Sequence, residues 1–299
     1  MRRVITPFIM LSLLLTGCSA LPYAHQIDKT VLMEVLGVDA GAGETVTVTA
    51  ASGARPGDQE PLVLSTQAGT ISAACADMGQ RGEDFVFFGD VEQVLVGEEE
   101  AQRGLESLLG HMAHDPELRL EAELWVVRGA EAADLLLEAG EGESLPDRLS
   151  AMSRNAELLG GPRPQMARGA LTDLLENGAT LLPALERREA EDGQGAQGEY
   201  VLVTAGYAVI RDGVLQGFTD ETAAFGADLL RSMGKGQVLE LSGPDRGYTA
   251  LKITGVKTTF RTVFEGDTLT GLRVACALET QAAELSGADF VDINMGCPV

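Results

Sequence analysis

Residues 85–96 read FVFFGDVEQVLV, and this apolar run decides the fold class together with the two segments after it. From about Glu98 to Met112, apolar residues recur at helical spacing, behind three Glu residues that suit the positive end of a helix dipole. Residues 118–127, which end in ELWVV, have the pattern of a strand. We expect the helix to dock on a sheet. The mixture of strands and helices predicts an α/β or α+β fold rather than a helical bundle.

The segments before this stretch support the same class. Residues 31–38 and 44–49 are rich in β-branched side chains around a Gly/Ala turn, which predicts a hairpin. After a loop at 53–63, the apolar residues of 71–78 follow helical spacing behind a possible Thr70 cap. Residues 130–139 indicate a further short helix.

The second half repeats the alternation of helices and strands. The expected elements are a helix over 166–176, a strand over 200–210, a helix from Thr219 or Asp220 to about Met233, and strands over 252–262 and 268–280. Arg211-Asp212-Gly213 predicts a tight hairpin turn, because Asp-Gly accepts positive φ angles.

Residues 140–166 contain many Gly, Pro and polar residues and are the best candidate for a domain boundary. We therefore expect successive small mixed-sheet domains with packed helices. The predicted segments are a signal peptide (1–17), an N-terminal α/β domain (18–150), a middle α/β domain (151–235), and an incomplete β-rich domain with an atypical tail (236–299).

The charge balance restricts the partners. The chain has 45 acidic and 22 basic side chains and a formal net charge of −23. Such a surface repels nucleic acid, which is bound by clustered Lys and Arg, so we expect no nucleic-acid partner. A hydrophobic content of 45% excludes disorder throughout.

The first residues, MRRVITPFIMLSLLLTGC, have the layout of a secretory signal: a basic start, a short apolar middle and small residues. The ending Leu15-Thr16-Gly17-Cys18 resembles a bacterial lipobox, in which the Cys thiol receives a diacylglyceryl group before cleavage. The alternative is a plain signal peptide with an incidental Cys. Two acyl chains make a stable anchor, and no later apolar run approaches membrane-spanning length. We expect a lipid anchor at Cys18.

The remaining cysteines form no recognisable motif. Cys75, Cys276 and Cys297 are odd in number and irregularly spaced. Cys75 lies on the apolar face of its predicted helix, and Cys276 alternates with apolar residues along its strand. We therefore predict that both are buried.

No catalytic residue, metal site or cofactor is predicted. His111 and His114, followed by Asp115, leave a surface metal site open, although solvated histidines at a helix end are the favoured interpretation. The acidic groups at 98–100 and 189–192 are more typical of solvated faces than of cation sites. The sequence lacks a G-x-S-x-G elbow and a phosphate-binding glycine loop.

A series of short motifs in a fixed order resembles the Ger(x)C family, the lipoprotein C subunits of spore germinant receptors. Besides the lipobox, the motifs are Leu36-Gly-Val-Asp39, Gly69-Thr-Ile-Ser72, FFGDVEQVLVGE at 87–98, Asp115-Pro-Glu-Leu-Arg119, Leu181-Leu-Pro183, Gly206-Tyr-Ala-Val-Ile210 and Gly213-Val-Leu-Gln-Gly-Phe218. The resemblance implies mixed α/β units without a known catalytic centre. It also implies membrane-embedded A and B subunits as partners, in the spore inner membrane, and a role in nutrient-triggered germination.

The last residues depart from that family, whose members continue with a helix-rich stretch. Residues 287–299, GADFVDINMGCPV, resemble the flavin-barrel segment of tRNA-dihydrouridine synthases, but a barrel takes roughly 200–250 residues and none follow here. The lipobox-like sequence and the resemblance to the Ger(x)C family together imply a lipid-anchored, non-enzymatic germinant receptor subunit on the extracytoplasmic face of the membrane. The alternatives are an extracytoplasmic small-molecule-binding lipoprotein and, remotely, a fragment of a flavin-dependent tRNA-dihydrouridine synthase.

Overall fold

The computed structural model describes residues 29–53, 61–81, 84–138, 144–189, 200–242 and 248–285. Most of its strands form one ten-stranded mixed sheet with the order β10-β9-β8-β6-β5-β1-β2-β3, in which β4 also pairs with β1 and β7 with β6. The bounds are β1 Thr30–Ala40, β2 Val46–Ser52, β3 Val63–Ala68, β4 Phe85–Phe87, β5 Gln93–Gly97, β6 Glu123–Arg128, β7 Gln165–Met166, β8 Ala179–Glu189, β9 Tyr200–Arg211 and β10 Val214–Phe218. The central strands β1, β5, β6 and β8 are parallel, and antiparallel strands extend the sheet at both ends.

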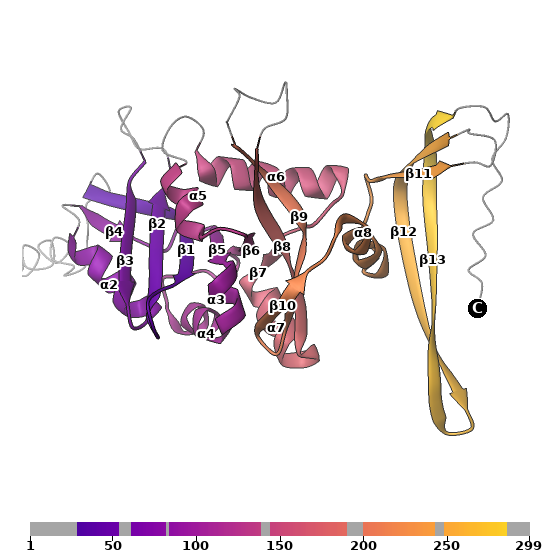
Figure 1. The fold of residues 1–299 in the computed structure, drawn as a ribbon, viewed down its shortest axis with the longest axis horizontal. Coiled ribbons are helices and arrows are strands. Elements are labelled where there is room, and N and C mark those ends of the chain that lie inside the picture. Colours follow the sequence, from indigo (N-terminus) through magenta and orange to yellow (C-terminus); the bar gives the residue numbers. More distant parts are fainter. Residues whose placement is uncertain are drawn as a thin grey trace, which may run out of the picture.

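Helices cover both faces of this sheet (Figure 1). Their bounds are α2 Ile71–Arg81, α3 Glu98–Arg103, α4 Glu106–His114, α5 Ala132–Glu138, α6 Leu145–Leu159, α7 Ala167–Asn177 and α8 Glu221–Leu230. Apolar residues of α2, α3, α4 and α7 share one core cluster with the sheet, and those of α5 and α6 share the other. The mixed α/β class predicted from the sequence is confirmed.

A buried polar chain holds α6 against the centre of the sheet. The indole N–H of Trp125 donates to Gln93 Oε1 at 2.6 Å, and Gln93 Nε2 donates to Glu123 Oε2 at 3.0 Å. Ser153 of α6 completes the chain by donating to Glu123 Oε1 at 2.8 Å. Trp125 is fully buried, and its only polar atom is satisfied, as the low polarity of a core requires.

Several predicted elements are confirmed together with the residues that end them. β1 and β2 form the expected antiparallel hairpin, and Thr70 Oγ1 accepts a hydrogen bond from Ala73 N at the start of α2. The turn between β9 and β10 has Asp212 at φ 50° and Gly213 at φ 80°. Asp220 caps α8 by accepting from Ala223 N at 2.7 Å.

The prediction of one continuous helix over residues 98–112 is wrong. The chain forms α3 and α4 instead, separated at Gly104, whose φ of 128° lies outside the helical region. The N–H of Leu105 donates to the carbonyl of Gly213 at 2.8 Å, so a long-range bond at the β9–β10 turn stabilises the break. The strand predicted over 118–127 begins only at Glu123.

The Gly- and Pro-containing stretch 140–166 includes the fifteen-residue helix α6, which is not among the predicted elements. The predicted boundary between residues 150 and 151 lies inside this helix. Strands from the two predicted units are neighbours in one sheet through the parallel pair β6 and β8.

A separate three-stranded sheet follows α8, with the order β11 (Val238–Ser242), β12 (Tyr248–Glu265) and β13 (Thr268–Leu285). β11 pairs only with residues 248–252 of β12, so β12 and β13 continue as a two-stranded ribbon that projects from the rest of the molecule (Figure 1). Cys276 of β13 is exposed, and its predicted burial is wrong because no described element covers this part of the ribbon.

Candidate functional site

The residues predicted to carry the anchor, Cys18 with Leu15, Thr16 and Gly17, lie outside the described residues. The signal peptide, the acidic group at 189–192 apart from Glu189, and the tail with Cys297 lie outside them too. The anchor therefore stays a prediction. Among the helices that the structure describes, none is long and apolar enough to span a bilayer.

Within the described residues, the best candidate site is a cleft at the carboxyl ends of the parallel strands. β1 ends at Ala40, β5 at Gly97 and β6 at Arg128, and ligands of open α/β sheets commonly bind at this edge. The cleft has a volume of about 680 Å³. We call it the acidic cleft after the six carboxylates that line it, Asp39, Glu98, Glu99, Glu100, Glu131 and Asp134.

Asp39 joins the end of β1 to the start of α5. Its side chain is 1% exposed and accepts hydrogen bonds from Ala132 N at 2.7 Å and Ala133 N at 2.9 Å. Burial raises the pKa of Asp39, although the two backbone N–H groups act in the opposite direction. A Cβ atom at Gly97 would lie 2.1 Å from Asp39 Oδ1, so this approach needs a glycine. The motif residues Asp39 and Gly97, distant in sequence, thus meet at one point.

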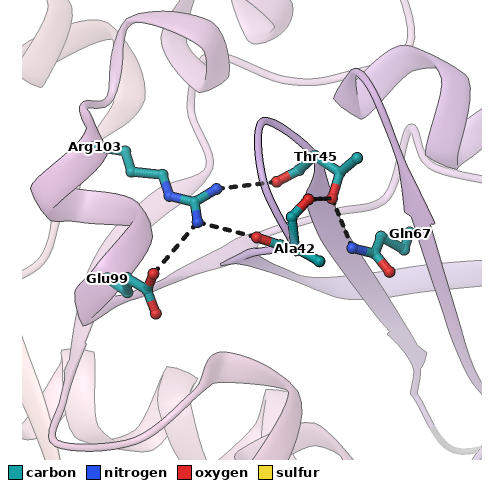
Figure 2. A network of polar contacts seen from close by, with 6 residues as sticks. Ala42, Thr45, Gln67, Glu99 and Arg103 are labelled. Atoms are coloured by element: carbon teal, nitrogen blue, oxygen red, sulfur yellow. Dashed lines mark hydrogen bonds and ion pairs between the residues drawn. The ribbon is translucent and has the colours of Figure 1, made fainter.

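Two further carboxylates of the acidic cleft also have intramolecular partners. Glu98 Oε2 accepts a hydrogen bond from Gly129 N at 2.8 Å, which connects the ends of β5 and β6. Glu99 pairs with Arg103 at 3.3 Å, and Figure 2 shows the same guanidinium donating to the β1–β2 turn. The turn acceptors are the carbonyls of Thr45, at 3.1 Å, and Gly41, at 3.0 Å. These contacts hold the cleft walls together.

Glu100 differs from Glu98 and Glu99 because most of the residue is buried. The residue is 5% exposed, and burial raises the pKa of its carboxyl group. The negative charges of Asp39 and Glu99 act in the same direction, and only Arg103 opposes them. The prediction that residues 98–100 form a solvated face is therefore wrong for Glu100.

The histidines do not converge on a metal site. His111 Nδ1 lies 3.0 Å from Ser72 Oγ, and its Nε2 lies 3.8 Å from Asp115 Oδ2, whereas His114 Nδ1 donates to the Gly110 carbonyl at 2.7 Å. The expected solvation holds for His114, which is exposed. It is wrong for His111, whose side chain is 8% exposed and whose pKa is lowered by burial. No group of three metal-ligating side chains occurs in the part of the chain that the structure describes.

Cys75 is half-buried and packs against the core cluster beneath α2. Burial raises the pKa of its thiol to about 12, and the charge of Asp115 adds to the effect. The thiol is therefore protonated at neutral pH and is a poor nucleophile. The predicted burial of Cys75 is therefore confirmed only in part, because the residue packs against the core but is half-buried.

Comparison with known proteins assigns the chain to a class. Residues 24–187, more than half of the chain, match the family model described as the spore germination protein N-terminal domain. The chain is thus a spore germination protein. It belongs to the Ger(x)C family, the C subunits of germinant receptors. Every residue of the acidic cleft lies within the matched range.

Among solved structures, the chain is similar to one described as the crystal structure of the GerBC protein. The two are 15% identical, the alignment covers 86% of this chain and 73% of that chain, and the TM-score is 0.45. A search of the curated proteins finds no match.

Proposed function

We propose that this chain is a lipid-anchored, non-enzymatic subunit of a spore germinant receptor and is needed for nutrient-triggered germination. The observation that carries the proposal is the match to the spore germination protein family over residues 24–187. The lipobox-like sequence Leu15-Thr16-Gly17-Cys18 lies shortly before the matched residues and supports the anchor.

The partners in this proposal are the membrane-embedded A and B subunits of the receptor. A diacylglyceryl group on Cys18 would hold the protein at the extracytoplasmic face of the spore inner membrane. The chain from Cys18 to Thr30, where β1 begins, can span at most about 40 Å. The body would stay close to the membrane, where a high effective concentration lets modest contacts suffice for assembly.

Replacing Cys18 with Ala in the native host tests this function. We expect the variant to fold normally, to leave the membrane fraction for the soluble fraction, and to give spores that germinate poorly with nutrients. Mass spectrometry of the wild-type protein should show a lipid-modified Cys18 at the mature N-terminus. The matched control is Cys276→Ser, which changes an exposed cysteine on β13 and should stay in the membrane fraction. A Cys18→Ala protein that fractionates with membranes as fully as wild type contradicts the anchor.

The acidic cleft favours a second candidate, an extracytoplasmic small-molecule-binding lipoprotein. The volume of the cleft, about 680 Å³, is within the range of sites that bind small molecules. A small nutrient that binds only the folded protein would raise its melting temperature. Melting temperatures that do not change across a set of nutrients would favour the receptor-subunit function alone.

A further inference from the structure

His111, in the last turn of α4, carries a polar atom that the fold leaves without a partner. Its side chain is 8% exposed, and its Nε2 is buried without a hydrogen-bond partner among the residues that the structure describes. A buried polar atom without a partner is costly and rare in folded proteins. Close packing alone does not explain why a titratable group occupies this position.

The two nitrogens of this imidazole face different parts of the molecule. Nδ1 lies 3.0 Å from Ser72 Oγ, so it forms a hydrogen bond between α4 and the start of α2. Nε2 lies 3.8 Å from Asp115 Oδ2, which is too long for a hydrogen bond. Asp115 is itself fixed, because its Oδ1 accepts from Glu117 N at 2.8 Å and its N–H donates to the His111 carbonyl at 2.9 Å.

The contact with Ser72 suits a neutral imidazole better than a protonated one. A neutral imidazole has one N–H donor and one acceptor nitrogen, whereas a protonated imidazole has two donors. Protonation of His111 therefore places a positive charge in a buried position, with a second N–H that has no acceptor within hydrogen-bond distance. Burying such a charge costs more free energy than burying the neutral group.

The charged groups around His111 do not offset this cost. Asp115 attracts a protonated imidazole and raises the pKa of His111, but burial lowers the pKa and is the larger effect. The other titratable groups belong to the elements that share a cleft with His111 or surround Asp115. They are Glu44 of the β1–β2 turn, Cys75 of α2, Glu100 and Arg103 of α3, Glu117 after α4, and Arg168 of α7.

We propose that His111 is a proton switch that holds the start of α2 against the end of α4 at neutral pH and releases it on acidification. The protonated imidazole leaves its buried position for water, and the hydrogen bond to Ser72 breaks. Ser72 and His111 both line a cleft of about 550 Å³, so the release widens this cleft. The inference does not depend on the anchor at Cys18.

The sign of the pH dependence follows from the lowered pKa of His111. A group whose pKa is lower in the folded state than in the open state stabilises the folded state above its open-state pKa, which is about 6.5 for histidine. This stabilisation is lost as the pH falls from about 6.5 through the pKa of the buried imidazole. The contact between α2 and α4 should therefore weaken in acid and not in base.

Amide hydrogen exchange of the purified full-length protein tests the switch, in wild type and in His111→Asn. Asn retains a polar group near the position of Nδ1 but cannot titrate. Between about pH 7.5 and about pH 5, after correction for intrinsic exchange rates, we expect the protection of α2 to fall about threefold or more further in wild type than in the variant. The protection of β5 and β6 should respond equally in the two proteins. The pKa of His111, measured by NMR, should lie below that of free histidine.

The matched control is His114→Asn, which removes an exposed histidine from the same turn of α4 and should respond to acid like wild type. Asp115→Asn is a second variant that leaves His111 in place and keeps the oxygen that accepts from Glu117 N. It should enlarge the loss of α2 protection in acid, because the protonated imidazole loses its attractive neighbour.

Three results would overturn the proposal. One is a pKa of His111 at or above that of free histidine. Another is an equal loss of α2 protection in wild type and in His111→Asn, which would mean that other groups cause the acid response. The third is a smaller loss in Asp115→Asn than in wild type. Circular dichroism at neutral pH establishes that each variant is folded.

Discussion

The ten-stranded sheet and the β12–β13 ribbon both contain strands rich in apolar and β-branched residues, yet they differ in the layers that cover them. Trp125 and Leu95 at the centre of the large sheet are fully buried, because helices pack on both of its faces. On the ribbon, Phe260, Phe264 and Leu272 are 53%, 57% and 60% exposed. A run of apolar and β-branched residues therefore predicts a strand, but the burial of its side chains depends on a second layer that comes from other parts of the chain.

The register of the ribbon places its apolar side chains on one face. Phe260 is opposite Val274, and this pair lies on the face that also carries the Thr262 and Leu272 pair; the register then shifts between Val263 and Phe264, and Phe264 is opposite Leu269. On the other face Arg261 is directly opposite Arg273, an arrangement of like charges that weakens strand pairing. The ribbon is amphipathic, but no element among the described residues supplies it with the apolar layer that stabilises the large sheet.

The largest loss of stability should come from a substitution in the core of the large sheet. We expect Trp125→Ala to lower the free energy of unfolding by about 3–5 kcal/mol, because it opens a cavity between the sheet and α6. It also removes the N–H donor from Gln93. Urea unfolding followed by circular dichroism measures the change. Trp125→Phe keeps most of the volume and should lose less, so equal losses in the two variants would contradict the cavity as the main cause.

An intermediate loss of stability is expected from a substitution where the large sheet and the ribbon join. Tyr207 Oη donates to Asp228 Oδ1 at 2.6 Å, and Gln237 Nε2, just before β11, donates to Asp228 Oδ2 at 2.9 Å. Burial raises the pKa of Tyr207, so its hydroxyl group stays a donor at neutral pH. Tyr207→Phe removes this bond from a buried carboxylate and should cost about 1–3 kcal/mol in thermal or urea unfolding.

Tyr200→Phe is the matched control for this junction. Tyr200 is 53% exposed, and its ring stacks against the guanidinium of Arg187 at 4.0 Å, a contact that Phe retains. Its stability should therefore be close to wild type. A Tyr207→Phe variant as stable as Tyr200→Phe would mean that the Asp228 network does not hold the junction together.

The sequence predicted most of the elements in both regions but not their packing. The Asp212-Gly213 turn and the Asp220 cap were predictable because each depends on neighbouring residues. The helix break at Gly104 was not, because the bond from Leu105 to Gly213 joins residues more than a hundred positions apart. α6 was missed for a different reason: Gly and Pro residues near its ends hid a helical segment, although Pro146 in its first turn is compatible with a helix start.

The candidate site could not be predicted either, because it also depends on contacts between residues that are distant in sequence. Asp39 and Glu98 belong to two of the short sequence motifs, but they meet at one sheet edge because β1, β5 and β6 are neighbouring parallel strands. The burial of Glu100 had no signal in a run of three Glu residues. Cys276 shows the opposite error, because its alternating pattern predicted a cover that the described residues do not provide.

The smallest effect on stability is expected from a substitution on the ribbon. Phe264→Ser should change the free energy of unfolding by less than about 0.5 kcal/mol, because the residue is 57% exposed and no described element forms a second layer over it. Urea unfolding of this variant beside Trp125→Ala measures the contrast directly. A loss above about 1 kcal/mol would show that this face of β12 and β13 is covered in solution, as the faces of the large sheet are. Hydrogen exchange supplies the independent measurement: amides of β12 beyond residue 252 should exchange faster than those of β5 and β6, because only one neighbouring strand protects them.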